Sequence, residues 1–470
     1  MSFLAKFNFL FLFFLSTSCI HGQEINVKHF GAKGDGVSLD TEPINKALQE
    51  LYRNGGGVLF FPKGIYRTNL IDIKPPKVMN IKIRGEGDGS LIKKNSSDKL
   101  GIGVFFSEVR GLSISLYNLS IDGNYLNRIR QWKSIDGKTL DVDNECNGIL
   151  IWNADKVRIE KCKISNVHGS GIAVYSSNNL LAIGNSIANT SGRGILGHRV
   201  ENMIANRNTI SNTGLFTNSF NLGGSEVSFS KKFKTLYGDG IESSAHIFMA
   251  DGNKIVNPGR IGISHDLARD LGYKNSSATV INNTVEINST KISNSNPPAG
   301  MWFEQTNDVR VINNSIIVKN SLSQVVSGIR FYAITGSVLC KQNTINALNY
   351  NLNLNEAIGI YEPRSSDFTI VENVMNGKFN NGISVSYEKE GARLLKLNID
   401  KNYIRGNSAI MKHGVNIGVY SNVDMPSNLS FSENKVNLNM EKQFKAEYFG
   451  NSNKKVDKSN FKVINNIQIK

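Results

Sequence analysis

An asparagine recurs at one position of a repeating frame through most of this 470-residue chain. Each asparagine is followed two residues later by an apolar side chain, and Cys162 with Ile164 takes the same place at the start of the series. From Cys162 the successive intervals are 23, 23, 45, 30, 31, 29, 30, 29 and 32 residues, which is the period of a solenoid and not of a mixed α/β domain. The asparagines are Asn185, Asn208, Asn253, Asn283, Asn314, Asn343, Asn373, Asn402 and Asn434.

A second column, Gly followed by an apolar residue, runs in step with the first. Short alternating stretches between the columns, such as residues 156–159 and 308–311, predict strands with one buried face. Turns of such strands, stacked in parallel about 4.8 Å apart, would bury the inward Ile, Val and Leu on the next turn. The pattern therefore predicts an all-β fold, a single right-handed parallel β-helix. The column consists of Gly148-Ile149, Gly171-Ile172, Gly194-Ile195, Gly240-Ile241, Gly262-Ile263, Gly300-Met301, Gly328-Ile329, Gly359-Ile360 and Gly382-Ile383.

The asparagines have a structural explanation. Asn tolerates left-handed backbone angles, which suits a tight turn, and stacked amides hydrogen-bond along a solenoid axis. We therefore expect these side chains to stabilise the turns and assign them no chemistry.

The N-terminal residues 1–22 have the features of a secretory signal. Lys6 precedes a short apolar run, and small residues follow up to Gly22, so we expect cleavage before Gln23. The residues ending at Cys19 also resemble a lipoprotein signal, which would place a lipid on Cys19. No later segment is long and apolar enough to span a bilayer. The expected protein is secreted or periplasmic, or tethered to the outer surface through Cys19, and is a monomer.

Cysteine usage gives no disulfide framework. Cys146, Cys162 and Cys340 remain after the signal, an odd number, and the last two are predicted to be buried apolar residues. A bridge between Cys146 and Cys162 is an alternative. No Cys/His cluster has metal-ligand spacing, so the sequence predicts no metal site of that kind.

The formal net charge is +15 at pH 7, which would attract nucleic acid, a membrane surface or an acidic polymer. Export, the spread of Lys and Arg along the chain and the lack of a basic helix or aromatic RNA-binding motif argue against nucleic acid. A polyanionic polysaccharide is the expected partner, and a basic surface with no partner is the alternative.

Residues 23–75 break the repeat and predict a cap, followed by the coils of residues 76–470. A strand and glycine turn over residues 25–36 precede Asp40-Thr41, where the N-cap of a helix belongs, and Pro43 follows in the first turn. Ile44, Ala47, Leu48 and Leu51 share one helical face, and residues 58–66 form the next strand and turn. Such a helix would cover the apolar end of the first coil.

The cap residues also carry a family resemblance. The series Phe-Gly-Ala-Lys-Gly-Asp-Gly from Phe30, Asp-Thr, Gly-Gly-Gly and Phe-Pro-x-Gly-x-Tyr resembles the N-terminal signature of the rhamnogalacturonase and epimerase-like pectate lyase superfamily. This resemblance implies a right-handed β-helix that acts on carbohydrate, often rich in uronic acid. It does not distinguish hydrolase from lyase or epimerase, because a shared scaffold hosts different sites.

A binding groove is predicted on the strand that follows each Gly-Ile pair, where alternate residues point outward. These outward residues are mostly apolar or small in the first coils, and from residue 196 to residue 364 they include acids, bases, arginine and aromatics, which places the site around the coils of residues 194–364. The outward pairs are Leu150 and Trp152, Ala173 and Tyr175, Leu196 and His198, Glu242 and Ser244, Ser264 and Asp266, Trp302 and Glu304, Arg330 and Tyr332, and Tyr361 and Pro363, with Arg364 just beyond.

Four carboxylates in this region suit glycosidic hydrolysis, which needs one protonated and one ionised carboxyl group. They are Asp239, Glu242, Asp266 and Glu304, and we expect Asp266 and Glu304 to lie one coil apart in one column, about 5 Å from each other. The sugar would stack on Trp302, Tyr332 and Tyr361 and be fixed by arginines, for which Arg193, Arg330 and Arg364 are candidates. This route needs no cofactor. The segment around Asp239 is similar to the Asn-Thr-Asp-Gly-Ile-Asp of polygalacturonases, but the Asp-Asp, Gly-His-Gly and Arg-Ile-Lys motifs of that family are missing.

Uronate elimination is the first alternative. It needs a base for the proton next to the carboxyl group and a cation to stabilise the resulting anion, for which His198, Tyr332 and Arg330 are candidates. This route is open with or without Ca²⁺, for which the acidic pair offers ligands. The Asp-Pro-His of mannuronan epimerases is missing.

A non-catalytic glycan-binding surface protein is the second alternative. Its scaffold would present the same files of side chains without a reaction.

Two interruptions of the repeat, residues 215–236 and 265–278, leave the solenoid beside the predicted groove, where long loops build the walls of a site.

Overall fold

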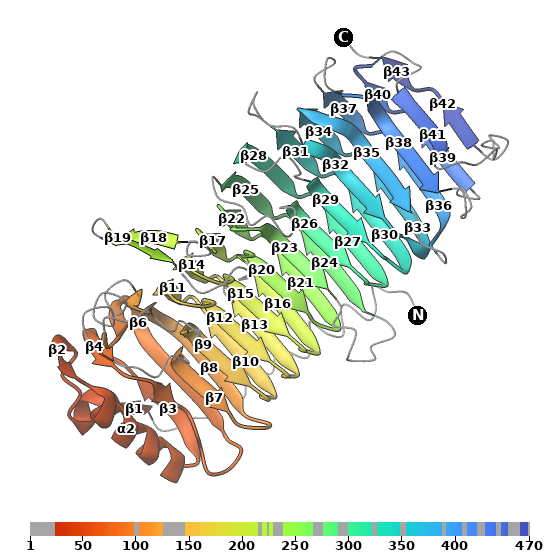
Figure 1. Ribbon diagram of the computed structural model, residues 1–470. Helices are drawn as coiled ribbons and strands as arrows, with labels where there is room; N and C mark the ends of the chain where they lie inside the picture. Colours follow the sequence, from red (N-terminus) through yellow and green to blue (C-terminus); the bar gives the residue numbers. More distant parts are fainter. Residues whose placement is uncertain are drawn as a thin grey trace.

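The computed structural model describes residues 24–97, 103–125, 146–214, 219–222, 225–228, 238–266, 276–289, 299–321, 327–347, 354–387, 392–406, 411–420, 428–438, 443–449 and 461–468. These residues form a right-handed parallel β-helix, as predicted, in which the strands of successive coils lie side by side from the N-terminal to the C-terminal end (Figure 1). A typical coil contributes one strand to a 13-stranded sheet and two strands to a 28-stranded sheet.

The 13-stranded sheet, here called the groove sheet, contains the strands that start at or near the glycine column. Its strands pair in parallel in chain order, each with the strand of the next coil. They are β5 (Ile71–Asp72), β7 (Gly103–Glu108), β9 (Asn147–Trp152), β12 (Ile172–Tyr175), β15 (Ile195–His198), β20 (Ile241–Ser244), β23 (Ile261–Asp266), β26 (Ala299–Glu304), β29 (Ser327–Tyr332), β32 (Leu354–Tyr361), β35 (Phe379–Tyr387), β38 (His413–Tyr420) and β41 (Phe444–Phe449).

The 28-stranded sheet forms the other sides of the coils. Its first strands are β1 (Glu24–Asn26), β2 (Asp35–Leu39), β3 (Gly56–Phe60), β4 (Gly64–Thr68), β6 (Asn80–Lys94) and β8 (Ser113–Asp122). One stack then contains β10 (Lys156–Glu160), β13 (Asn179–Ile183), β16 (Asn202–Asn206), β21 (Ile247–Asp251), β24 (Ser277–Ile281), β27 (Asp308–Ile312), β30 (Gly336–Lys341), β33 (Arg364–Val371), β36 (Arg393–Asp400), β39 (Asn428–Ser432) and β42 (Phe461–Ile464). The second stack contains β11 (Lys163–Val167), β14 (Ser186–Thr190), β17 (Thr209–Ser211), β22 (Lys254–Val256), β25 (Thr284–Ser289), β28 (Ser315–Ser321), β31 (Thr344–Ala347), β34 (Val374–Gly377), β37 (Tyr403–Gly406), β40 (Lys435–Val436) and β43 (Ile467–Gln468).

The predicted asparagines form a continuous ladder of hydrogen bonds between these two stacks. The Nδ2 of each donates to the Oδ1 of the asparagine in the next coil at 2.8–3.1 Å, from Asn185 through to Asn466. The predicted backbone conformation is wrong by one position, because the residue before each asparagine adopts the left-handed angles, as Asn282, Gln342 and Lys401 do. The asparagine side chain is buried in the ladder, so the left-handed residue of each turn is the solvent-exposed or half-buried residue before it.

The interior of the solenoid is filled by inward side chains from both sheets. Files of Ile, Val and Phe run along the axis, and Phe303 stacks on Phe331 of the next coil with ring centroids 5.6 Å apart. The column glycines are required by close packing. A Cβ at Gly300 would lie 2.6 Å from the carbonyl oxygen of Gly328 and 2.6 Å from the Ile316 side chain.

The helix α2 (Thr41–Arg53) closes the N-terminal end, and a short 3-10 helix η1 (Val27–Phe30) precedes it (Figure 1). Ile44, Ala47, Leu48 and Leu51 are buried, as predicted from their spacing. Asp40 is the N-cap residue, but its carboxylate does not cap the helix. It accepts hydrogen bonds from the backbone N–H groups of Lys33 and Gly34 instead, so it stabilises the preceding glycine turn.

Three further expectations have a structural outcome. Cys146, Cys162 and Cys340 are all buried with free thiols, so the alternative of a Cys146 to Cys162 bridge is wrong. No helix among the described residues is long and apolar enough to cross a membrane. Residues 1–22, with Cys19, lie outside the described residues, as do most of the predicted wall segments. The described part of residues 215–236 is an antiparallel hairpin of β18 (Ser219–Leu222) and β19 (Ser225–Ser228).

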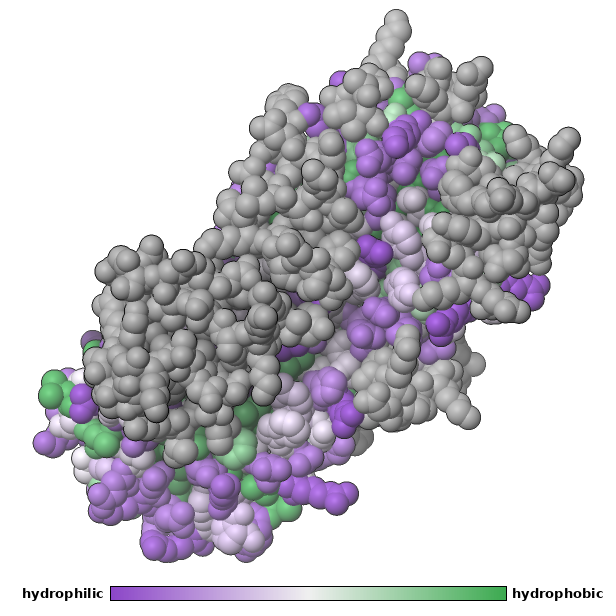
Figure 2. All heavy atoms as spheres, viewed as in Figure 1, coloured by the Kyte–Doolittle hydropathy of each residue, from purple (hydrophilic) through white to green (hydrophobic). Residues whose placement is uncertain are grey.

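In the view of Figure 1, the described surface is mostly hydrophilic, with smaller apolar patches (Figure 2).

Candidate active site

Outward side chains of the groove sheet form two parallel columns, as the two-residue alternation predicts. In the first column Glu242, Ser264, Trp302 and Arg330 are successive register partners on β20 to β29. In the second column Asp266 pairs with Glu304, and Glu304 pairs with Tyr332. The predicted neighbourhood of Asp266 and Glu304 is therefore confirmed.

The predicted alignment of the next coil is wrong by two residues. Gly359 is the register partner of Arg330, and Tyr361 is the partner of Tyr332. Ala357 takes the place of the column glycine. This is seen at Gly328, where an added Cβ would meet the carbonyl oxygen of Ala357, just as an added Cβ at Gly300 would meet that of Gly328. Tyr361 therefore belongs to the second column, and the predicted outward position of Pro363 falls after the end of β32.

Arg364 lies away from the groove. It begins β33, a strand of the 28-stranded sheet, and its backbone N–H donates to the carbonyl of Ile334. The structure therefore separates Arg364 from the other predicted substrate-binding residues, because the chain has already turned out of the groove sheet at that point.

A third outward column stands directly before the glycine column, and the sequence pattern did not reveal it. Asp239 occupies this position in its coil, and its carboxylate accepts a hydrogen bond from Ser264 Oγ at 2.6 Å across the groove face. Arg193 and Glu356 occupy equivalent positions in other coils, and the Arg193 guanidinium reaches Glu242. Strict alternation would turn these side chains inward, but the backbone changes direction at the glycine column.

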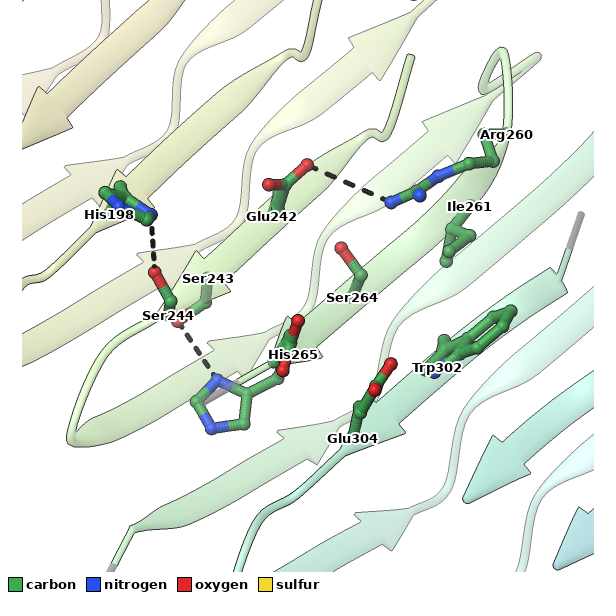
Figure 3. A pocket seen from close by; sticks show the side chains of 11 residues that line it. His198, Glu242, Ser243, Ser244, Arg260, Ile261, Ser264, His265, Trp302 and Glu304 are labelled. Atoms are coloured by element: carbon green, nitrogen blue, oxygen red, sulfur yellow. Dashed lines mark hydrogen bonds and ion pairs between the residues drawn. The ribbon is translucent and has the colours of Figure 1, made fainter. Parts of the chain in front are cut away.

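A cavity of about 320 Å³ lies on this face over β15 to β26. It brings together five of the predicted residues, namely His198, Glu242, Asp266, Trp302 and Glu304 (Figure 3). It is completed by Ser243, Ser244, Arg260, Ile261, Ser264 and His265. Figure 3 shows that these side chains come from neighbouring strands, so residues of different coils meet at one site.

Two of the four predicted carboxylates are held in ion pairs with arginines. Arg260 Nε and Nη2 donate to the two Asp239 oxygens at 2.8 and 2.6 Å, and the Asp239 side chain is fully buried. Arg193 Nε and Nη2 donate to Glu242 at 2.8 and 3.2 Å. Both carboxylates therefore have their oxygens engaged in hydrogen bonds to arginines and form part of the wall of the site.

The histidines of the cavity differ in environment. His198 is half-buried, and its Nδ1 lies 2.9 Å from Ser244 Oγ. His265 points into the solenoid, where its ring stacks on Phe248 at 5.4 Å and its Nδ1 lies 3.2 Å from Ser243 Oγ. Burial lowers the pKa of His265 to about 3, so this ring is neutral at ordinary pH.

Arg330 lies between two aromatic rings on the other side of Trp302 from the cavity. Its guanidinium carbon is 4.6 Å from the centroid of the Trp302 ring and 4.2 Å from that of Tyr361. Its Nε and the Trp302 Nε1 are buried without a hydrogen-bond partner. Among the described residues, no carboxylate forms an ion pair with Arg330, in contrast to Arg193 and Arg260. The protein therefore holds a cation at the groove surface with donor capacity unused.

A buried acid that the sequence pattern missed lies next to this arginine. Glu356 is fully buried, and Ser327 Oγ donates to its Oε1. Burial raises the pKa of Glu356 and outweighs the opposing effects of Ser327, Tyr361 and Arg330. Burial, followed by the charge of Glu356, also raises the pKa of Tyr361. The signal that was available is the acid directly before Ala357-Ile358, the pair that replaces Gly-Ile.

The structure does not bring His198 and Arg330 together. They stand on β15 and β29, which are four strand positions apart, or about 19 Å at the spacing of parallel strands. One sugar residue cannot contact both, so the predicted combination of His198 and Arg330 for elimination is wrong. The side chains that do adjoin Arg330 are Trp302, Tyr361, and Tyr332 two residues along its own strand.

No metal cluster is evident in the part of the chain that the structure describes, where no three His, Cys, Asp or Glu side chains are grouped to hold an ion. Asp266 and Glu304 are adjacent, but they are only two carboxylates. The Glu304 carboxylate also accepts a hydrogen bond from Gln305 Nε2 at 3.1 Å.

Comparison with known proteins confirms the resemblance predicted from the cap. Residues 24–242 match the family described as Rhamnogalacturonase A/epimerase, pectate lyase-like. Among curated proteins, the chain is similar to Mannuronan C5-epimerase AlgE2 of Azotobacter vinelandii, with 31% identity over 166 residues. It is also similar to Alginate lyase 7 of the same organism, with 34% identity over 110 residues.

These similarities cover limited parts of both partners. The match to the epimerase spans 32% of this chain and 15% of the epimerase, and the match to the lyase spans 22% and 13%. The chain therefore aligns with about a seventh of the length of these relatives.

Solved structures share the fold over most of the chain. The A-module of the Azotobacter vinelandii Mannuronan C-5 epimerase AlgE6 superposes with a TM-score of 0.51 at 15% identity, covering 95% of this chain and 99% of that one. PfbA, a surface adhesin of Streptococcus pneumoniae, superposes with a TM-score of 0.51 at 16% identity, covering 82% and 92%. At this level of identity the likeness extends to the fold alone.

Proposed function

We propose that this chain, which carries the rhamnogalacturonase A/epimerase, pectate lyase-like sequence over residues 24–242, acts on a uronic-acid-containing polysaccharide. The substrate lies in the groove, and the reaction begins with removal of the proton at C5 of a uronate whose carboxylate binds Arg330. The names of the two relatives support this chemistry, since one is a mannuronan C5-epimerase and the other an alginate lyase. Epimerisation and elimination share this first step.

The environment of Arg330 carries the proposal. The rings of Trp302 and Tyr361 hold the guanidinium plane, and none of the described carboxylates is ion-paired with it. A planar guanidinium binds a carboxylate through two parallel hydrogen bonds, and it stabilises the negative charge that develops when C5 loses its proton. Aromatic rings beside it offer faces on which a pyranose stacks.

The side chains that transfer the proton are those of the second column, Tyr332 and Glu304. Tyr332 follows Arg330 by two residues on the same face, and Glu304 is the register partner of Tyr332. Both side chains are half-buried beside the Arg330 position, so a uronate bound there presents its C5 toward them. One of them takes the C5 proton. The electron pair then either expels the oxygen at C4, which breaks the glycosidic bond, or takes a proton on the opposite face, which inverts C5.

Hydrolysis is the second candidate, favoured by the pairing of Asp266 with Glu304. Neighbouring positions on parallel strands are about 4.8 Å apart, and retaining glycosidases separate their two carboxyl groups by about 5–5.5 Å. Asp239 and Glu242 do not contribute in this scheme, because arginines neutralise them.

Incubation of the purified full chain with alginate, pectin and a neutral polysaccharide separates these candidates. Elimination gives a product that absorbs in the ultraviolet. Epimerisation changes the NMR signals of the uronate without shortening the polymer, and retaining hydrolysis gives new reducing ends with unchanged anomeric configuration. Binding without any product would support a non-catalytic glycan-binding protein and contradict the proposal. Activity that survives a chelator would support Arg330, and not Ca²⁺, as the group that neutralises the carboxylate.

Export is also proposed, on the basis of the signal-like residues 1–22. N-terminal sequencing of the protein from culture medium and membranes tests it. A start at Gln23 indicates cleavage and release, and a blocked, lipid-bearing Cys19 indicates an anchored protein.

A further inference from the structure

Glu356 has no role in the reaction described above, although its carboxyl group lies beside the binding arginine. It is completely buried on the third outward column, opposite Ser327 of β29 and Asn381 of β35. Ser327 donates a hydrogen bond to its Oε1. A fully buried acid on a binding face has to be explained, because burial of a carboxylate is unfavourable unless it is paired or neutral.

Gly359 creates the space for this acid. It is the register partner of Arg330, in a column where the two preceding coils carry Trp302 and Arg330. A Cβ at Gly359 would lie 2.6 Å from Tyr361 Cε2 and 2.8 Å from Glu356 Oε1. The missing side chain therefore lets the Glu356 carboxyl group and the edge of the Tyr361 ring meet next to the guanidinium.

Among the described residues that influence Glu356, Arg330 is the one cation. Ser327 and Arg330 face it from β29, Asn355 and Tyr361 from its own strand, and Asn381 from β35. Arg330 and Tyr361 are the titratable groups among these. Burial is the largest influence on Glu356 and raises its pKa, so its carboxyl group resists ionisation even with Arg330 close by.

We propose that Glu356 is a positioning residue for the uronate site, whose buried carboxyl group holds the Tyr361 ring against Arg330 and leaves the Arg330 charge for the substrate carboxylate. This inference rests on the proposed function. In this arrangement Gly359, Glu356 and Tyr361 form one unit, in which the glycine supplies space, the acid fills it and the ring orients the guanidinium.

The expected pH dependence follows from the direction of the pKa shift. Below the raised pKa of Glu356 the carboxyl group is neutral, and Arg330 binds the uronate. As the pH rises through this pKa, Glu356 becomes an anion beside Arg330 and competes with the substrate carboxylate. The affinity for a uronate is therefore highest at lower pH and falls as the pH increases.

The test uses the full chain, a trisaccharide of mannuronate as the probe, and titration calorimetry between about pH 6 and about pH 9, a range that includes the pKa values known for buried glutamates. For the wild type we expect the affinity to fall about tenfold over this range. Glu356→Gln has the same shape and is always neutral, so its affinity should match that of the wild type at low pH and stay nearly constant. Glu433→Gln, an exposed glutamate on a turn of a C-terminal coil, is the matched charge control and should follow the wild type.

Tyr361→Phe gives a second, independent measurement in case Glu356→Gln does not fold, as judged by circular dichroism. The ring remains, but the hydroxyl that lowers the pKa of Glu356 is gone, so the loss of affinity should move to higher pH. Identical pH profiles for Glu356→Gln and the wild type, or an unchanged midpoint in Tyr361→Phe, would overturn the role of Glu356 and leave the uronate site intact. No binding by the wild type at any pH would overturn both the site and this inference.

Discussion

In the coils of β15 and β23 the arginine that precedes the strand is ion-paired with a carboxylate, whereas Arg330 on β29 lies between two aromatic rings. Arg193 and Arg260 form two-pronged ion pairs with Glu242 and Asp239, and the side chains of these arginines are only 13% and 18% exposed. Arg330 has the same charge but lies in the first outward column, where Trp302 and Tyr361 flank it.

This difference separates two uses of one residue type. In an ion pair between buried partners the two charges compensate each other and hold both side chains in place. Such a pair contributes little net stability, but removal of one partner destabilises the protein because the other charge is left buried and uncompensated. Aromatic faces orient a guanidinium without neutralising it, so its donors remain for a ligand. We therefore expect mutations in the first region to act on stability and mutations in the second to act on substrate.

The largest expected effect is on the ion-paired region. Asp239→Asn keeps the shape of the side chain but leaves the Arg260 charge uncompensated, and we expect the free energy of unfolding to fall by about 3 kcal/mol. Chemical denaturation monitored by circular dichroism measures it. Asp367→Asn, on an exposed position of β33, is the control and should change stability little. A loss of uronan processing without a loss of stability in Asp239→Asn would argue that this acid takes part in the reaction.

The next effect is on the aromatic region. Arg330→Ala removes the cation proposed to bind the uronate, and we expect kcat/KM for a uronan to fall about a hundredfold with the fold intact. Arg330→Lys should restore little, because an ammonium group lacks the planar pair of donors. Arg364→Ala removes an exposed arginine from the other sheet and serves as the matched control. Wild-type kinetics in Arg330→Ala would contradict the proposed binding site.

Glu304 and Asp266 distinguish the two candidate reactions. For proton removal at C5 we expect Glu304→Gln to lower kcat about tenfold, since Tyr332 remains as a proton carrier, and Asp266→Asn to have a smaller effect. Initial rates on one uronan, with both variants side by side, give the comparison. Equal and nearly complete loss in both variants is the result expected of a hydrolase, and would contradict C5 chemistry.

The smallest effect concerns the rings that hold Arg330. Trp302→Leu keeps an apolar side chain but removes the aromatic face, and we expect KM to rise about fivefold, the size of one cation–π contact. Trp302→Phe should recover most of this loss. Steady-state kinetics with thermal melts separates the effect from destabilisation, and a change in kcat alone would contradict a role in binding.

The fold was predictable because one geometric rule repeats. The interval between asparagines and the Gly-apolar pairs imply stacked coils, and the two-residue alternation after each glycine then aligns Asp266 with Glu304. These inferences need only the length of a coil and the geometry of a strand. The cap helix was also predictable, since the spacing of Ile44, Leu48 and Leu51 is local information.

The site was less predictable where local features depend on the coil before or after. Gly359-Ile360 has the letters of the column, but Ala357-Ile358 takes the place, so Tyr361 was aligned with the wrong neighbour. Glu356 was missed because the backbone turns at the glycine column, which brings the preceding side chain onto the groove face. The separation of His198 from Arg330 depends on counting strands, and not on the distance along the sequence.

The asparagine ladder has one direction, since every amide donates toward the C-terminal neighbour. A whole coil inserted or removed between two rungs leaves donors facing acceptors, and the remaining bonds re-form without inversion. The length of this solenoid is thus free to change in steps of one coil, while the side chains of the remaining coils keep their positions relative to the ladder.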